Sequence, residues 1–207
     1  MIEFLQSVFE YTSWIQIFSL VSGVIYCLMQ VVQHKWMWYF GLMTAGAALI
    51  VAIINFDSTG AWAPLWAQFI LNSYFFLMDI VGIFSWRKIR SREGAQAVNI
   101  VKLERKSVLR YGAGLMILTP VICLIFAFTN DPDPVAEGIS FGLSIVAQLM
   151  LTRSHIEQWF MWMAADIVAI IVYSGQGAWW MVGLYYCYIL SAFFGVYYWR
   201  QHGAHLK

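Results

Sequence analysis

The sequence contains few charged residues. Asp, Glu, Lys and Arg make up 11% of the 207 residues, whereas 61% are hydrophobic. A water-soluble domain has about 25% charged and about 45–50% apolar residues. So large a surplus of apolar side chains cannot be accommodated on a surface that faces water. The composition therefore excludes a soluble globular domain and predicts a protein whose solvent is lipid.

Residues and motifs that carry chemistry are also scarce. The sequence has no Walker loop, no nucleophile elbow and no His-Glu-x-x-His zinc motif. Its four His residues lie at helix ends or in the tail, which argues against a haem or metal site in the membrane. The three Cys residues, all in apolar runs, predict no disulfide framework. We expect neither an enzyme nor a cofactor, and no basic, aromatic face for nucleic acid.

Seven apolar windows are long enough to cross a bilayer, whose hydrocarbon core of about 30 Å needs roughly 20 helical residues. Because the runs are continuous rather than alternating, they predict helices and not a barrel. The predicted spans are 14–33, 36–55, 65–86, 111–128, 138–156, 159–175 and 179–199. We expect an all-α integral membrane protein whose single transmembrane domain covers residues 1–207.

Positive charges lie on one side of this seven-span path. All 12 Lys and Arg fall in the first, third and fifth loops or in the tail, and eight of them in the loop 87–110. The other side carries only acidic residues: Glu3, Glu10, Asp57, Asp131, Asp133 and Glu137. Because basic loops stay cytoplasmic, the N-terminus is predicted outside and the C-terminus inside. We interpret the loop 87–110 as a topology determinant that contacts anionic lipid, with a regulatory docking site as the alternative.

The first three spans resemble the last three. The shared landmarks are Gly60-Ala61-Trp62 and Gly177-Ala178-Trp179, Gly82-x-x-x-Trp86-Arg87 and Gly195-x-x-x-Trp199-Arg200, and His34 and His155. With 111–128 as an unpaired linker helix, the bundles 14–86 and 138–199 run in the same direction. Such a parallel 3+1+3 repeat is typical of transporters whose substrate binds between the halves.

Two carboxylates, Asp79 and Asp166, lie inside predicted spans. A charge in hydrocarbon costs at least about 2.5–3.5 kcal/mol, so each is a candidate functional residue. Asp79 is seven residues from Trp86 and Asp166 is seven from Trp159, which places both about 10 Å from the predicted cytoplasmic boundary. No Lys or Arg lies deep inside a span to pair with them, and the lack of Lys there excludes a retinal Schiff base. Each carboxyl is expected to hold a proton or await a cation; the alternative is a structural role, as a protonated Asp bonded to a backbone carbonyl or to a neighbouring Gln or Tyr.

Trp159, Trp162 and Asp166 are spaced i, i+3 and i+7, so one helical face carries two indoles and a carboxylate. Such a face suits a flat cationic ligand, which the rings stack on or attract by cation–π contact. The alternative places both indoles in the interfacial belt, which suits Trp159 better than the deeper Trp162. Three more polar residues are candidates for the same site, with helix–helix hydrogen bonding as their alternative role: Asn72, Tyr185 and Gln148.

The run 144–166, with Trp159, Trp162 and Asp166 in a Trp-x-x-Trp-x-x-x-Asp pattern, resembles the signature of the PnuC family of bacterial vitamin transporters. The resemblance covers nearly the whole chain. It implies a multi-pass protein of the bacterial cytoplasmic (inner) membrane, with a 3+1+3 fold similar to that of SWEET sugar transporters. It also implies facilitated diffusion of nicotinamide riboside, thiamine or a related nucleoside, trapped by a cytoplasmic kinase, with substrate bound by these three residues.

The chain departs from the family pattern at three positions. Asp166 and Asp79 stand where nicotinamide riboside carriers usually have Asn, and Asn72 where they usually have Gln. A second carboxylate suits a thiazolium cation, so we favour thiamine over nicotinamide riboside as the substrate. A proton symporter, an energy-coupling-factor substrate subunit and a membrane-embedded interaction or sensory protein acting through the loop 87–110 remain alternatives, and homo-oligomerisation stays open.

Overall fold

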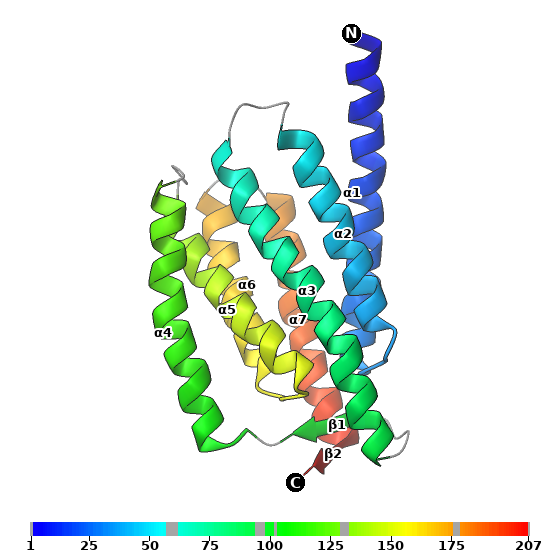
Figure 1. Ribbon diagram of the computed structural model, residues 1–207, viewed down its shortest axis with the longest axis vertical. Helices are drawn as coiled ribbons and strands as arrows, with labels where there is room; N and C mark the ends of the chain where they lie inside the picture. Colours follow the sequence, from blue (N-terminus) through cyan, green and yellow to red (C-terminus); the bar gives the residue numbers. More distant parts are fainter. Residues whose placement is uncertain are drawn as a thin grey trace.

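The computed structural model of the chain describes residues 2–56, 62–93, 98–101, 103–128, 133–175 and 179–206. In these ranges the chain forms seven helices and two short strands (Figure 1). The elements are α1 (Ile2–Val31), α2 (Met37–Phe56), α3 (Trp62–Glu93), β1 (Val98–Val101), α4 (Arg105–Phe128), α5 (Pro134–Thr152), α6 (Gln158–Gly175), α7 (Trp179–His202) and β2 (Gly203–Leu206).

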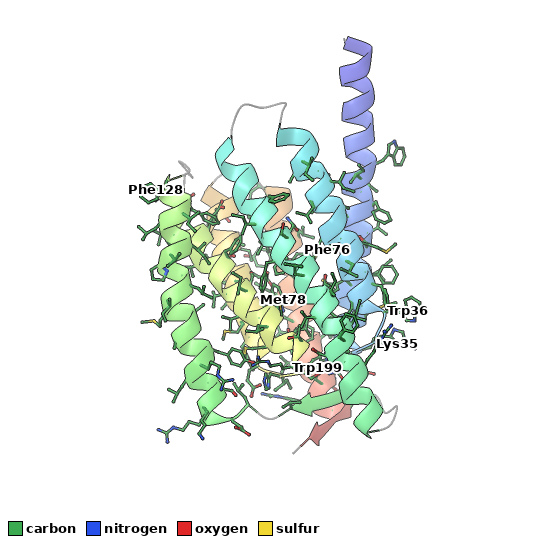
Figure 2. The ribbon with its side chains drawn as sticks, in the orientation of Figure 1. Lys35, Trp36, Phe76, Met78, Phe128 and Trp199 are labelled. Atoms are coloured by element: carbon green, nitrogen blue, oxygen red, sulfur yellow. The ribbon has the colours of Figure 1, made fainter. Side chains whose placement is uncertain are left out.

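The helices present apolar side chains outward and keep polar ones inside. Met116 is 78% exposed and Phe128, at the end of α4 far from the strands in Figure 2, is 86% exposed, whereas Asp79 is 2% exposed. By length and apolar composition, four helical segments of the described chain could cross a membrane: Phe69–Arg87, Arg105–Phe128, Pro134–Thr152 and Gln158–Gly175. Ile17–Val31 and Met37–Ile53 are shorter apolar helices. The inside-out distribution is the one that a lipid solvent requires.

The helices pack in two groups. α1, α2 and α3 contact one another in sequence and form the first bundle; α5, α6 and α7 form the second bundle in the same way. α4 packs on α5 at one edge of the molecule (Figure 1). The bundles meet where α1 contacts α7 and where α3 contacts α5. The interface between the bundles is therefore formed by α1 and α3 of the first bundle and by α5 and α7 of the second.

Several helices extend beyond the predicted spans. α3 continues to Glu93 and α4 begins at Arg105, so much of the predicted loop 87–110 is helical. The predicted spans end where the apolar residues end. Lys and Arg also favour helix, so both helices continue beyond the apolar stretch without a break. α5 differs in the other direction, because it ends at Thr152 rather than at 156.

A two-stranded parallel sheet was not expected in an all-α protein. β1 lies in the segment between α3 and α4, and β2 follows α7; Val98 pairs with Gly203 and Val101 with Leu206. We call this sheet the ribbon, and the end of the molecule that carries it the ribbon end (Figure 1). Ile100 of β1 is 1% exposed and packs into the core. The ribbon ties the basic segment to the C-terminal tail.

The α5–α6 turn is held by the ribbon. The Val101 amide donates to the Ser154 carbonyl oxygen at 3.1 Å, and Nδ1 of His155 donates to the Val101 carbonyl oxygen at 3.0 Å. Burial lowers the pKa of the His155 imidazole from its ordinary 6.5, so the ring is mainly neutral near pH 7. His34, its counterpart in the α1–α2 turn, is exposed. The ribbon therefore restrains one of two otherwise similar turns.

The two turns share one backbone geometry. Gln33 and Ser154 both have positive φ angles, of 50° and 58°. The His34 amide donates to the carbonyl oxygen of Met29 at 2.8 Å, as the His155 amide does to that of Met150 at 3.1 Å. The sequence landmarks Gly60-Ala61 and Gly177-Ala178 lie outside the described residues, so the comparison of the two halves rests on these turns and on the indoles next to them.

Each bundle has an indole ring laid over a helical glycine. Trp38 of α2 packs on Gly82 of α3, and Trp159 of α6 packs on Gly195 of α7. The same rings make edge contacts: Trp38 with Trp86 at 5.2 Å and Trp159 with Trp199 at 5.7 Å between ring centroids. A Cβ at either glycine would overlap the indole, so glycine is required for this close approach.

Gly82→Ala and Gly195→Ala are each expected to lower the stability of the protein by about 1–3 kcal/mol, because the added methyl group overpacks the indole. Thermal unfolding in detergent measures the effect. Gly112→Ala in α4 is the matched control, since a Cβ there meets nothing within 4 Å. The control should be neutral or slightly stabilising. Equal melting temperatures for all three variants would contradict the role of the glycines.

Candidate substrate-binding site

A cavity of about 740 Å³ lies between the two bundles. Residues of all seven helices line it, including Phe126 of α4. Every residue that the sequence singled out is among them: Asn72, Asp79, Gln148, Trp159, Trp162, Asp166 and Tyr185. The fold therefore brings these seven residues, from four helices, to one cavity of a size typical for small-molecule sites.

The cavity follows the helices toward the ribbon end and stops there. Its lining runs from Glu137 in the first turn of α5 and Tyr173 in the last turn of α6 to Gln30 in the last turn of α1 and Trp159 in the first turn of α6. Beyond that level the side chains are fully packed: Met37, Leu151, Gln158 and Trp199 are each 0% exposed. In Figure 2, Trp199 lies close to the ribbon.

Asp79 accepts a hydrogen bond from the second bundle. Nε2 of Gln148 on α5 donates to Asp79 Oδ1 at 3.0 Å, and the Tyr26 hydroxyl on α1 donates to Gln148 Oε1 at 3.3 Å. Gly41 on α2 leaves room for the carboxyl, because a Cβ there would lie 2.5 Å from Asp79 Oδ2. Gln148 is therefore one of the alternative partners that the sequence analysis considered for Asp79. The hydrogen bond between them joins the two bundles.

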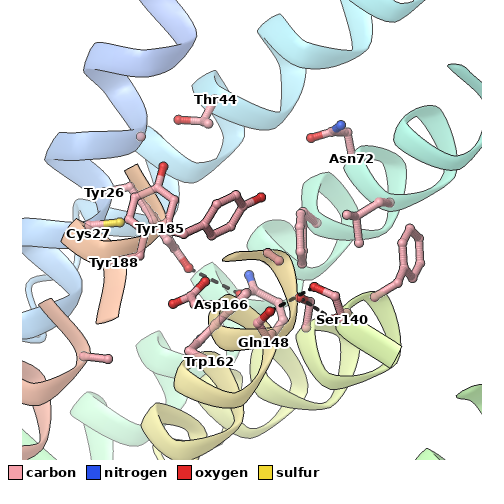
Figure 3. A pocket seen from close by; sticks show the side chains of 18 of the residues that line it. Tyr26, Cys27, Thr44, Asn72, Ser140, Gln148, Trp162, Asp166, Tyr185 and Tyr188 are labelled. Atoms are coloured by element: carbon pink, nitrogen blue, oxygen red, sulfur yellow. Dashed lines mark hydrogen bonds between the residues drawn. The ribbon is translucent and has the colours of Figure 1, made fainter. Parts of the chain in front are cut away.

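Asp166 has a different environment. It is 6% exposed and lines the cavity, and the described part of the chain offers it no hydrogen bond and no ion pair. Cys27, Tyr185 and Tyr188 lie near enough to interact with it electrostatically. Figure 3 shows the Asp166 side chain pointing into the space between α1, α6 and α7. Of the two acids, Asp166 is the one whose two oxygens both lack a hydrogen-bond partner in the described structure.

The two indoles of the predicted face also differ. Trp162 is half-buried, lines the cavity, and has its ring centroid 6.1 Å from that of Phe75 on α3. Trp159 is 3% exposed and packs on Gly195 and Trp199, so most of its ring belongs to the core. Trp162 therefore offers a stacking surface to the cavity, whereas Trp159 forms part of the wall at the ribbon end.

Tyrosines form a further wall of the cavity. Tyr185 stacks on Tyr173 with ring centroids 5.5 Å apart, and meets Tyr188 edge-on at 5.8 Å. Asn72, another of the candidate polar residues, lies in Figure 3 apart from the group around Asp166. Both residues line the cavity, but at different places along it.

Sequence reasoning missed several lining residues of α1. Gly23, Tyr26, Cys27 and Gln30 all face the cavity. Their spacing of i, i+3, i+4 and i+7 marks one small or polar stripe on an otherwise apolar helix, and this signal could have identified them. Tyr26 was hard to recognise as a site residue, since Tyr is also common in the interfacial belt.

A model of the family described as "Nicotinamide mononucleotide transporter" matches residues 13–201. The chain belongs to this family. Two relatives are the nicotinamide riboside transporter PnuC of Escherichia coli strain K12 and that of Haemophilus influenzae. The first is 23% identical and the alignment covers 80% of this chain and 76% of the relative; the second is 24% identical, with 91% and 80% covered.

The fold is that of the solved vitamin B3 transporter PnuC. That structure matches with a TM-score of 0.69 at 21% identity, over 97% of this chain and 86% of the other. As a member of the nicotinamide mononucleotide transporter family, the chain is a multi-pass inner-membrane transporter of a small vitamin-type molecule and not an enzyme. The preference for thiamine finds no support, because the relatives carry the name of nicotinamide riboside.

Proposed function

We propose that the chain carries nicotinamide riboside across the inner membrane by facilitated diffusion. The names of its relatives support this substrate. The observation that carries the proposal is Asp166, a carboxyl without a hydrogen-bond partner in the described structure, which shares a cavity with the half-buried ring of Trp162. Nicotinamide riboside is a flat pyridinium cation with an amide and ribose hydroxyls, so it matches both groups.

In the proposed pose, the ligand lies along the length of the cavity. The pyridinium ring would stack on the face of Trp162 that the cavity exposes, with its charge near Asp166. The tyrosine side chains of α7 and Asn72 also line the cavity and would contact the ribose and the carboxamide. Asp79 would act through Gln148, its hydrogen-bond partner. Each of these assignments pairs residues that line the cavity with a specific part of the ligand.

The proposal includes a parallel 3+1+3 repeat of the SWEET type, with residues 14–86 and 138–199 as the two halves and 111–128 as the linker. The matching turns and the matching indole–glycine pairs support it. The positive charges favour an N-terminus outside and a cytoplasmic ribbon end. A cytoplasmic kinase would trap the vitamin, because a carrier without energy coupling only equalises concentrations on its two sides.

Calorimetry of the purified protein with nicotinamide riboside and thiamine, side by side, tests the substrate. We expect saturable binding of nicotinamide riboside and weaker or absent binding of thiamine. The reverse order would overturn the assignment and return thiamine as the substrate. Uptake of nicotinamide riboside into proteoliposomes, with and without a pH gradient, tests the mechanism; accumulation driven by the gradient would indicate a proton symporter.

A further inference from the structure

The floor of the cavity is a hydrogen bond between the two bundles. Nε2 of Gln30, on α1, donates to Oε1 of Gln158, on α6, at 3.1 Å. The two side chains are 4% and 0% exposed, and Gln30 lines the cavity while Gln158 lies beneath it. A ligand that left the cavity through the ribbon end would have to pass this amide pair.

The backbone around Gln30 receives a second bond from the other bundle. Nε1 of Trp199, on α7, donates to the carbonyl oxygens of Gln30 at 3.3 Å and Val31 at 3.0 Å. Trp199 is 0% exposed, so both interactions are shielded from water. Two helices of the second bundle, α6 and α7, are thus hydrogen-bonded to the same turn of α1.

The neighbouring indole contacts stay within one bundle. Trp38 packs on Gly82 and meets Trp86 edge-on, all in the first bundle. Trp159 packs on Gly195 and meets Trp199 in the second bundle in the same manner. Because each pair lies within one bundle, a separation of the bundles would leave both pairs intact, although the two pairs pack together in one buried cluster. Among the hydrogen bonds of the described residues at this end, those on Gln30 and Val31 are ones that such a movement must break.

The ribbon closes the same end from below. Ile100 of β1 is 1% exposed in the cluster that contains Trp38, Trp86 and Trp199. Since β1 is also bonded to the α5–α6 turn through Val101, it follows the second bundle at this point. A separation of the bundles would therefore leave the ribbon on the second bundle and expose the floor along α1.

We infer that Gln30 is the gating residue of the ribbon end: its bonds to Gln158 and Trp199 hold the cavity closed on that side, and their rupture opens it. The inference rests on the proposed function in two respects: transport needs alternating access to the cavity, and the ribbon end is cytoplasmic. It assigns Gln30 a role in positioning the bundles, without requiring that Gln30 touch the ligand.

The test measures from which side Cys27 can be modified. Cys27 lines the cavity about one helical turn from Gln30. In a Cys123→Ser, Cys187→Ser background it is the remaining cysteine of the sequence. A membrane-impermeant, cationic methanethiosulfonate is applied to right-side-out and inverted membrane vesicles, and the rate of modification is read by mass spectrometry.

Gln30→Ala is expected to raise the rate of Cys27 modification in inverted vesicles, where the ribbon end is accessible, about tenfold relative to right-side-out vesicles. Gln158→Leu removes the same bond from the other bundle with a side chain of similar size, and should shift the ratio in the same direction. Having two variants keeps the test decisive if one of them does not fold.

Tyr74→Phe is the matched control. The Tyr74 hydroxyl also bridges the bundles, donating to the Ile145 carbonyl oxygen at 2.8 Å, but it does so away from the cavity floor. The ratio should stay at its wild-type value in this variant. An unchanged ratio in both Gln variants, or an equal rise in Tyr74→Phe, would overturn the inference. Since no vitamin is added, a wrong substrate assignment would leave this result unaffected.

Discussion

Replacing Asp166 by Ala is expected to weaken the binding of nicotinamide riboside by about 10- to 100-fold. Interactions with a charged group contribute about 1.5–3 kcal/mol, and each 1.4 kcal/mol corresponds to a factor of about ten in affinity. In the described structure no protein group is hydrogen-bonded to this carboxyl. Its removal should therefore lower the affinity for the ligand without breaking a hydrogen bond within the described protein. Calorimetry in detergent measures the dissociation constant.

Two further variants sharpen the Asp166 experiment. Asp166→Asn keeps the size and the acceptor oxygen but removes the charge, so it separates charge attraction from hydrogen bonding to a ligand hydroxyl. Glu104→Ala removes an equal charge from an exposed position near the start of α4 and should bind as the wild type does. Wild-type affinity in Asp166→Ala would contradict the site.

Trp162→Ala is expected to weaken binding by about 5- to 100-fold. Stacking of a flat heterocycle on an aromatic side chain contributes about 1–3 kcal/mol when measured by alanine substitution, and a cationic ring adds cation–π attraction. Trp162→Phe should recover most of the affinity because it keeps a ring opposite Phe75. The measurement is again the dissociation constant for nicotinamide riboside.

Trp14→Ala is the control for Trp162, since Trp14 is 71% exposed on α1 and far from the packed core. Its affinity should equal that of the wild type. Trp159→Ala is a less informative variant, because Trp159 also packs on Gly195 and Trp199 and its removal should lower stability as well as binding. Equal binding by Trp162→Ala and Trp14→Ala would show that Trp162 is not a stacking residue.

Polar residues inside the membrane were predictable as a group. A carboxyl or amide in hydrocarbon is costly, so the few that occur are found where another helix or a cavity receives them. For this reason Asp79, Asp166, Gln148 and Asn72, chosen from the sequence alone, all line one cavity. Tyr26 was not predicted, because a Tyr in a span does not have the free-energy cost of a carboxyl or an amide and is therefore not marked as a site residue.

The sequence could not distinguish the two acids. Asp79 and Asp166 have the same depth and the same lack of a basic partner along the chain. Only the packing of α5 against α3 places Gln148 beside Asp79 and leaves Asp166 without a hydrogen bond in the described structure. This difference depends on contacts between residues about 70 positions apart, which no local pattern reports.

The amino-acid sequence by itself determined the solvent, the seven helices and the kind of residue that faces inward, because apolar length and the cost of buried charge act locally along the chain. The tertiary structure decided which polar groups satisfy one another, that Trp159 serves mainly the core, and that a ribbon joins β1 to β2 over more than 100 residues. Those outcomes depend on how the bundles and the chain ends meet in space.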